Sequence, residues 1–86
     1  MKIRLHKATD IGPIVRAARK AQRIRQDDMA GAIGVSENFL GKVERGGGNA
    51  QWTKVFQVLD GLGIELVCDI PDDAEDFLPD ELKGGS

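Results

Sequence analysis

The sequence predicts a mainly α-helical domain in which four short helices are followed by one β-strand. Two observations support this fold class. Apolar residues recur at helical spacing in four segments between residues 11 and 62, and glycine or serine residues separate these segments. Residues 64–70 then alternate between apolar and polar side chains, the pattern of a half-buried strand. A chain of 86 residues is large enough for one hydrophobic core.

The first two helices are predicted at residues 11–23 and 26–33. Asp10 is a candidate N-cap for the first helix, because Pro13 then falls in the first turn, where its missing N–H costs nothing. Gly34 suits a left-handed C-cap of the second helix. The residues of the second helix that we expect in the core are Met29, Ala30 and Ile33.

The third and fourth helices are predicted at residues 37–45 and 51–62. Ser36 is a suitable N-cap for the third helix. The glycines at 46–48 must form a loop, since neither helix nor strand favours three successive glycines. The expected core residues are Leu40 and Val43 from the third helix, and Trp52, Val55 or Phe56, Leu59 and Leu62 from the fourth.

The predicted strand at residues 64–70 places Ile64, Leu66, Cys68 and Ile70 on one face, and Pro71 stops it. A lone strand cannot pair its own backbone groups. Its partner is therefore the alternating segment at residues 2–6, the same strand of a second subunit, or both, and the second option implies a dimer. The single cysteine excludes an intrachain disulfide and a cysteine-cluster metal site, and the apolar run favours burial of Cys68.

Charge divides the chain into a body at residues 1–71 and an acidic tail at residues 72–86. The net charge of the whole chain is −2, but the tail holds six carboxylates and one lysine. The body is therefore mildly basic, as in a nucleic-acid-binding domain with an acidic appendage. The tail has few apolar side chains and is predicted to be disordered; acidic tails of this kind often only solvate a protein.

The composition also bears on location and catalysis. Neither a membrane-spanning apolar run nor a signal peptide is evident, so we expect a cytoplasmic protein. The single histidine, His6, has no nucleophile or paired carboxylate at a catalytic spacing, and the glycine run lacks the lysine of a phosphate-binding loop. We therefore expect no enzyme activity, no cofactor and no metal.

Two short helices joined by the turn at residues 34–36 form a helix-turn-helix unit, whose second helix enters the major groove of DNA. Side chains at the start of that helix meet base edges: Asn38 suits adenine, Lys42 guanine and Glu37 cytosine. The alternative is that these residues form only a solvated helix face. The candidate DNA-binding residues are Gln26, Ser36, Glu37, Asn38, Gly41, Lys42, Arg45 and Lys54.

The spacing of residues 26–46 resembles the Cro-type, or XRE-family, helix-turn-helix, whose usual pattern is Q-x-x-L-A-x-x-x-G-V-S-x-x-x-I/L-x-x-x-E-x-G. This chain departs from it with Met29 in place of leucine and with the loose glycine loop at 46–48. The resemblance covers residues 11–62 and implies a four-helix, lambda-repressor-like fold. It also implies that Arg19 and Glu44 form a semi-buried structural salt bridge.

The strand and the polar tail that follow this body resemble those of HipB-type antitoxins. That resemblance implies a homodimer whose C-terminal strands pair, a palindromic operator in double-stranded DNA, and a HipA-like kinase toxin as partner. The function expected is a transcriptional repressor that autoregulates a toxin–antitoxin operon. The alternatives are a phage or mobile-element regulator without a toxin, and a protein-interaction module that has lost DNA binding.

Overall fold

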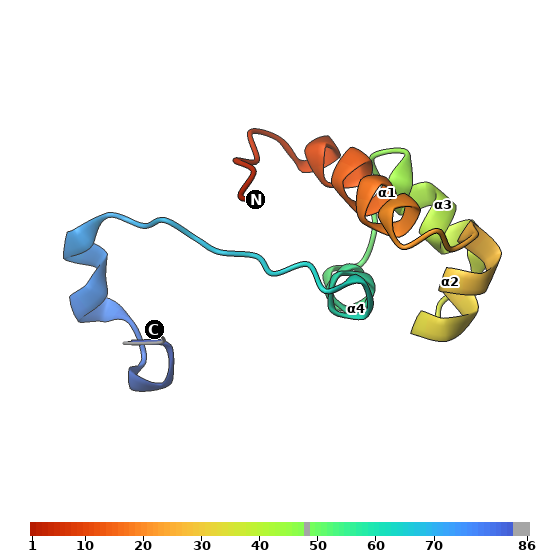
Figure 1. Ribbon diagram of the computed structural model, residues 1–86. Coiled ribbons are helices and arrows are strands. Elements are labelled where there is room, and N and C mark those ends of the chain that lie inside the picture. The colour runs from red at the N-terminus through yellow and green to blue at the C-terminus, as the bar shows by residue number, and fades with distance from the viewer. Residues whose placement is uncertain (48, 84–86) are drawn as a thin grey trace.

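The computed structural model describes residues 1–47 and 49–83 (Figure 1). The four predicted helices are confirmed, each with ends within two residues of the expected ones. A 3-10 turn, Ala8–Asp10, leads into the first helix, and two further 3-10 segments follow the fourth. The bounds of the α-helices are α1 Ile11–Ala21, α2 Gln26–Ile33, α3 Glu37–Glu44 and α4 Trp52–Leu62.

The turn between α2 and α3 has the chemistry that the sequence predicts. Gly34 ends α2 in the left-handed conformation, with φ of 93°, which glycine adopts without steric cost. Ser36 then caps α3, because its hydroxyl accepts a hydrogen bond from the backbone N–H of Phe39 at 3.0 Å. These two residues fix the path by which the chain enters α3.

Asp10 does not cap α1 with its side chain, as the sequence predicted it would. Its backbone is already helical and its side chain makes no bond to the first turn of α1. Its carboxylate instead accepts hydrogen bonds from the backbone N–H groups of His6, at 2.9 Å, and Lys7, at 3.1 Å. These bonds, that from His6 foremost, hold the pKa of Asp10 below its ordinary value. The carboxylate therefore fastens the preceding segment to the base of α1.

The hydrophobic core lies where the four helices meet. The predicted core residues Met29, Ala30, Leu40 and Val43 are all buried, and Ile33 packs against them half-buried. The buried side chains from the other two helices are Val15 on α1 and Val58, Leu59 and Leu62 on α4.

Helices α1 and α3 approach closely at Gly12. A Cβ atom added there would lie 2.7 Å from the carbonyl oxygen of Glu44, 2.8 Å from the amide nitrogen of Gly46 and 2.9 Å from the carbonyl oxygen of Val43. Backbone atoms cannot rotate away as a flexible side chain can. A residue without a side chain at this position therefore lets the first helix lie directly on the end of the third.

The predicted C-terminal β-strand is wrong for this chain on its own, and residues 2–6, a possible strand by their alternation, do not form one either. Residues 64–70 are extended, but within residues 1–47 and 49–83 no segment forms a β-ladder. A strand exists only where a neighbouring backbone supplies hydrogen-bond partners, and residues 2–6 do not pair with residues 64–70. Alternation in a sequence shows that a segment can be a strand without supplying its partner.

Two residues expected in the interior, Trp52 and Cys68, are instead exposed, and of the alternatives Val55 and Phe56 it is Val55 that packs against the core. Trp52 is 73% exposed and Phe56 is 49% exposed, with their ring centroids 5.9 Å apart on the surface of α4. Cys68 is also exposed, which corrects its predicted burial. The helical spacing of α4 places more apolar residues on the helix than the other three helices of one chain can cover.

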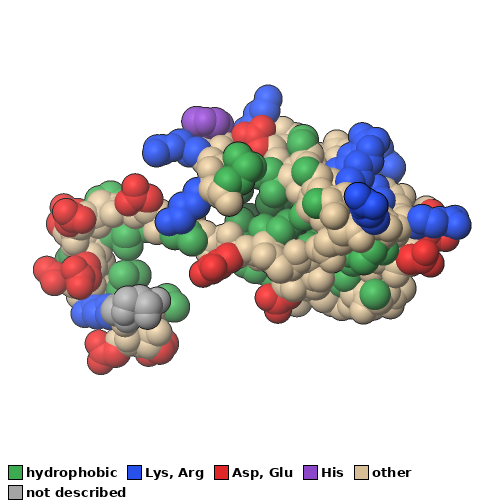
Figure 2. Space-filling view, viewed as in Figure 1, with side chains coloured by type: hydrophobic (Ala, Val, Ile, Leu, Met, Phe, Trp, Pro, Cys, Tyr) green, Lys and Arg blue, Asp and Glu red, His purple; other side chains and the backbone are tan. Residues whose placement is uncertain are grey.

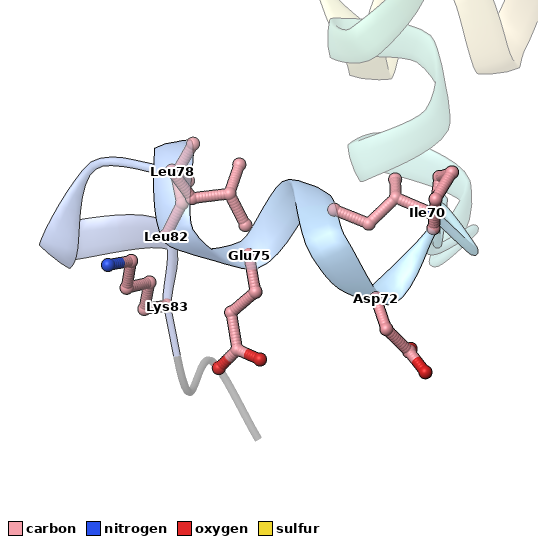
Figure 3. A pocket seen from close by; sticks show the side chains of 7 residues that line it. Ile70, Asp72, Glu75, Leu78, Leu82 and Lys83 are labelled. Carbon is pink, nitrogen blue, oxygen red and sulfur yellow. The ribbon is translucent and has the colours of Figure 1, made fainter.

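The described part of the acidic tail, residues 72–83, is called the acidic segment below. It stands away from the helical body at the end of an extended chain (Figure 1). It forms two 3-10 segments, Asp72–Phe77 and Asp80–Leu82. In Figure 3 the side chains of Leu78 and Leu82 lie close together, while the carboxylates of Asp72 and Glu75 point away from them. Residues 84–86 of the expected tail lie outside the described residues, and disorder of the tail stays a prediction.

Candidate nucleic-acid interface

Helix α3 has an inner face and an outer face with different residues. Leu40, Gly41, Val43 and Glu44 are buried against the other helices. The predicted base-contacting residues Glu37, Asn38 and Lys42 are all exposed. Asn38 and Lys42, four residues apart, share the outer side of the helix, whereas Glu37 is exposed at its first turn. The inner face fixes the position of the helix, so the outer side chains are presented to solvent on a rigid support.

An ion pair joins α1 to the end of α3, as the resemblance implied. Arg19 Nε donates to Glu44 Oε2 at 2.6 Å and Arg19 Nη2 donates to Glu44 Oε1 at 2.9 Å, the bidentate geometry that guanidinium favours. Arg19 Nη1 also donates to the carbonyl oxygen of Ile24 at 3.0 Å, in the link between α1 and α2. One guanidinium group therefore holds α1, this link and α3 together.

The pair is mostly shielded from solvent, since the side chains of Arg19 and Glu44 are 11% and 4% exposed. Burial opposes ionisation of Glu44 and is the largest single influence on it, but the hydrogen bonds from Arg19 and Gln26 and the charges of Arg19 and Arg16 outweigh burial. The pKa of Glu44 is therefore lowered. The hydrogen bond to Glu44 raises the pKa of Arg19, so both groups are charged at neutral pH.

Gln26, at the start of α2, is linked to the same ion pair. Its Nε2 donates to Glu44 Oε1 at 3.2 Å. Beside it, a Cβ added to Gly41 would lie 3.1 Å from Arg45 Nη1 and 3.4 Å from Gln26 Oε1. The structure thus brings Gln26, Gly41 and Arg45 together, and Gly41 leaves room for the side chains of the other two.

Lys54, on the first turn of α4, lies against α3. Its ammonium group is 5.7 Å from the centroid of the Phe39 ring, a cation–π contact worth about 0.5–1 kcal/mol at an exposed site. Lys54 therefore adds positive charge near α3, although it is on a different helix. The assignment of these residues to DNA contacts stays a prediction.

The charges of the molecule are segregated in space. Figure 2 shows Lys and Arg side chains gathered on the helical body, whereas many of the Asp and Glu side chains in this view lie over the acidic segment at the other end. This arrangement agrees with the basic body and acidic tail expected from the sequence. The basic surface is therefore not neutralised by the residues that make the chain acidic as a whole.

Arg16 is a residue of this surface that sequence reasoning missed. It lies on α1 and lines an open hollow together with Gln26 and Arg45. Its position three residues before Arg19, one helical turn away, was the available signal.

In the described part of the chain, no three His, Cys, Asp or Glu side chains are grouped as a metal site requires. None of the described helices has the length and apolar character to cross a membrane.

The class of protein defined by this geometry is a helix-turn-helix DNA-binding protein: two short helices at a tight turn, with polar side chains on the outer face of the second. Comparison with known proteins agrees. The helix-turn-helix family HTH_3 matches residues 15–67. An uncharacterised HTH-type transcriptional regulator of Sinorhizobium fredii, y4mF, is 44% identical over 66 residues, covering 77% of this chain and 87% of its own. The chain therefore belongs to the helix-turn-helix family of transcriptional regulators.

Solved structures show the same fold at lower sequence identity. A chain of the HipA-HipB-O2-O3 complex superposes with a TM-score of 0.72 at 20% identity, covering 81% of this chain and 100% of that one. A chain of a HipB-O1-O2 complex gives a TM-score of 0.71 at 20% identity, with 79% and 100% coverage. This likeness shows that the chain has the same fold as these solved structures.

Proposed function

We propose that this protein is a homodimeric, sequence-specific repressor that places α3 in the major groove of a palindromic operator. The observation that carries the proposal is that α3 is anchored by buried residues while Glu37, Asn38 and Lys42 are exposed and free to reach base edges. The family membership supports the same mode of binding. Ser36 would face a phosphate at the start of the helix.

The assignment of the outer face is tested with an Asn38→Ala/Lys42→Ala variant on a DNA duplex that carries the promoter of its own gene. Both side chains are exposed, so the circular dichroism spectrum and the melting temperature should stay unchanged. Removing one good bidentate bond to a base costs about 1–3 kcal/mol, so affinity should fall at least fivefold. Lys83→Ala removes the same charge far from α3 and serves as the control. Unchanged promoter affinity of the folded double variant contradicts the assignment.

The proposal of a homodimer is supported by apolar side chains that one chain leaves uncovered. In addition to Trp52 and Phe56 on α4, three apolar residues after this helix are exposed: Val67, at 77%, and Leu66 and Ile70. We place the dimer contact on two parts of this surface. One is the exposed rings of Trp52 and Phe56 on α4, and the other is residues 64–70 with Ile64, Leu66, Cys68 and Ile70, of which Ile64 already packs half-buried on the core. Apolar surface of this kind usually marks an interaction site.

Light scattering tests the homodimer. The native chain should have the mass of two copies, and Phe56→Glu should give monomers because it places a charge within the proposed contact. Thr53→Glu adds the same charge at another exposed position of α4 and should leave the dimer intact. A Phe56→Glu protein that is folded and still dimeric contradicts this location of the contact.

We further propose that the protein is the antitoxin of a toxin–antitoxin pair whose toxin resembles the kinase HipA. The fold shared with HipB supports this, as does an acidic segment that stands free of the body with Phe77 89% exposed. The test is co-expression with the product of the adjacent gene. The antitoxin hypothesis expects that this product arrests growth alone, and that the full chain binds it and restores growth. An adjacent product without toxicity favours a phage or mobile-element regulator.

A further inference from the structure

An open hollow of about 230 Å³ lies between α1, the start of α2 and the C-terminal half of α3. Its buried part is the Arg19–Glu44 ion pair, and the side chains of Arg16 and Arg45 are exposed at its edge. The hollow therefore adjoins the proposed DNA surface but lies outside the outer face of α3. The residues that line it are Arg16, Arg19, Gln26, Gly41, Glu44 and Arg45.

The charge of this hollow is positive. Glu44 compensates Arg19 through the two hydrogen bonds described above, so the guanidinium groups of Arg16 and Arg45 remain. Among the residues that the structure describes, ion pairs are formed by Arg19 and Arg25, and by neither Arg16 nor Arg45. Two guanidinium groups without a partner carboxylate lie at one edge of the hollow. Each guanidinium group presents a planar fork of N–H donors, so the pair suits an anion with several oxygen atoms.

Gln26 adds an oriented neutral donor. An ionised carboxylate only accepts hydrogen bonds, so Glu44 fixes which end of the Gln26 amide faces it. One N–H of Nε2 is used in this bond and the second is left for a ligand. The absence of a side chain at Gly41 lets the guanidinium group of Arg45 lie beside this amide. The hollow thus combines two charges with a donor whose direction is set by the ion pair beneath it.

We propose that this hollow holds one phosphate of the DNA backbone, and that Arg16 on α1 is a phosphate ligand alongside Arg45 and Gln26. The proposal rests on the proposed DNA-binding function and adds a contact from a helix outside the helix-turn-helix pair. A phosphate is the anionic group that every duplex presents at fixed spacing along its surface. The contact would fix the position of the body on the duplex without reading its sequence.

The test measures how the affinity for duplex DNA depends on salt, by fluorescence anisotropy of a labelled duplex carrying the protein's own promoter. Removal of one cationic side chain that neutralises a phosphate should reduce the slope of log K against log salt by about 0.9. Arg16→Gln should lower the slope by up to this amount per binding site, because Arg45 remains at the same phosphate. The control is Arg4→Gln, the same substitution at an exposed residue outside the hollow, and it should leave the slope close to that of the native protein.

Equal slopes for Arg16→Gln and Arg4→Gln, with a steep slope for the native protein, would overturn the phosphate site and leave DNA binding standing. A native protein that fails to bind the duplex at any salt concentration would instead overturn the proposed function. Methylphosphonate substitution of single phosphates gives a second measurement. Neutralising one particular phosphate per half-site should weaken binding of the native protein more than binding of Arg16→Gln, in which only Arg45 and Gln26 remain to contact it. If no phosphate position shows this difference, the site is overturned.

Discussion

Replacing Gly12 with alanine should destabilise the protein, whereas the same replacement at Gly31 should stabilise it. Both residues are helical, so both variants gain from the lower conformational entropy of unfolded alanine, by up to about 0.5–1 kcal/mol. Gly31 is exposed, and an added Cβ would have no heavy atom within 4 Å. The two variants therefore share a propensity gain and differ in what the new methyl group meets.

At Gly12 the new methyl group meets backbone. The separation of 2.7 Å from the carbonyl oxygen of Glu44 must grow to at least 3.4 Å for ordinary contact. Helix α1 would have to retreat from α3 and would carry with it Val15, which is fully buried one turn further on. Overpacking of this kind costs about 1–3 kcal/mol. After the propensity gain, Gly12→Ala should lose about 1–2 kcal/mol of the free energy of unfolding.

Urea denaturation followed by far-ultraviolet circular dichroism measures both variants. The measurements belong at one protein concentration, because association of subunits would make stability depend on it. A difference of about 2 kcal/mol between the variants corresponds to roughly 8–16 °C in melting temperature for a domain of this size. A Gly12→Ala protein as stable as Gly31→Ala would refute the argument that the close approach of α1 and α3 determines the residue at position 12.

Three further predictions concern the elements that hold the helix-turn-helix in place. Ser36→Ala removes the cap of α3 and should cost about 1 kcal/mol in urea denaturation, while Thr53→Ala, a control without a cap hydrogen bond, should cost less. Arg19→Met leaves the shielded carboxylate of Glu44 without its counter-charge and should lower the free energy of unfolding by about 3 kcal/mol. The double variant Arg19→Met/Glu44→Met should recover most of that loss, and equal losses in the two variants would contradict this role of the pair. Because the folded pKa of Glu44 is lowered, its contribution to stability is present above its ordinary pKa of 4.5 and is lost as the pH falls through the lower folded value. Glu44→Gln should therefore show a flatter decline in stability below pH 4.5 than the native protein, and identical profiles would exclude the contribution.

The sequence predicts the local features of the turn between α2 and α3 correctly, but not the cap of α1, where Asp10 bonds to the preceding segment instead. The left-handed Gly34 and the cap at Ser36 follow from local steric and hydrogen-bond preferences, so their positions are predicted correctly. The Arg19–Glu44 pair, separated by 25 residues, came from the resemblance and not from spacing. Local patterns fix the helices, while a family pattern is needed to identify contacts between them.

Features that depend on contacts across the fold could not be predicted in this way. Helical spacing shows that Trp52 and Phe56 belong to an apolar helix but not whether the same chain covers them. Alternation at residues 64–70 likewise leaves the partner of a strand undetermined. Gly12 gave no distinctive signal, because it matters through its contact with the end of α3. The only signal for Arg16 was its position one helical turn before Arg19, which does not show that three helices form a hollow around it.

The division of α3 into two faces has a consequence for how such a regulator acquires a new target. The residues that maintain the fold, such as Leu40, Val43 and Glu44, point inward, and those that would read DNA point outward. Substitutions at exposed positions away from caps and ion pairs usually change stability by less than about 0.5 kcal/mol. New operator preferences can therefore be explored at Glu37, Asn38 and Lys42 with little risk of unfolding, and duplicated copies of such a gene can diverge in target while they keep one architecture.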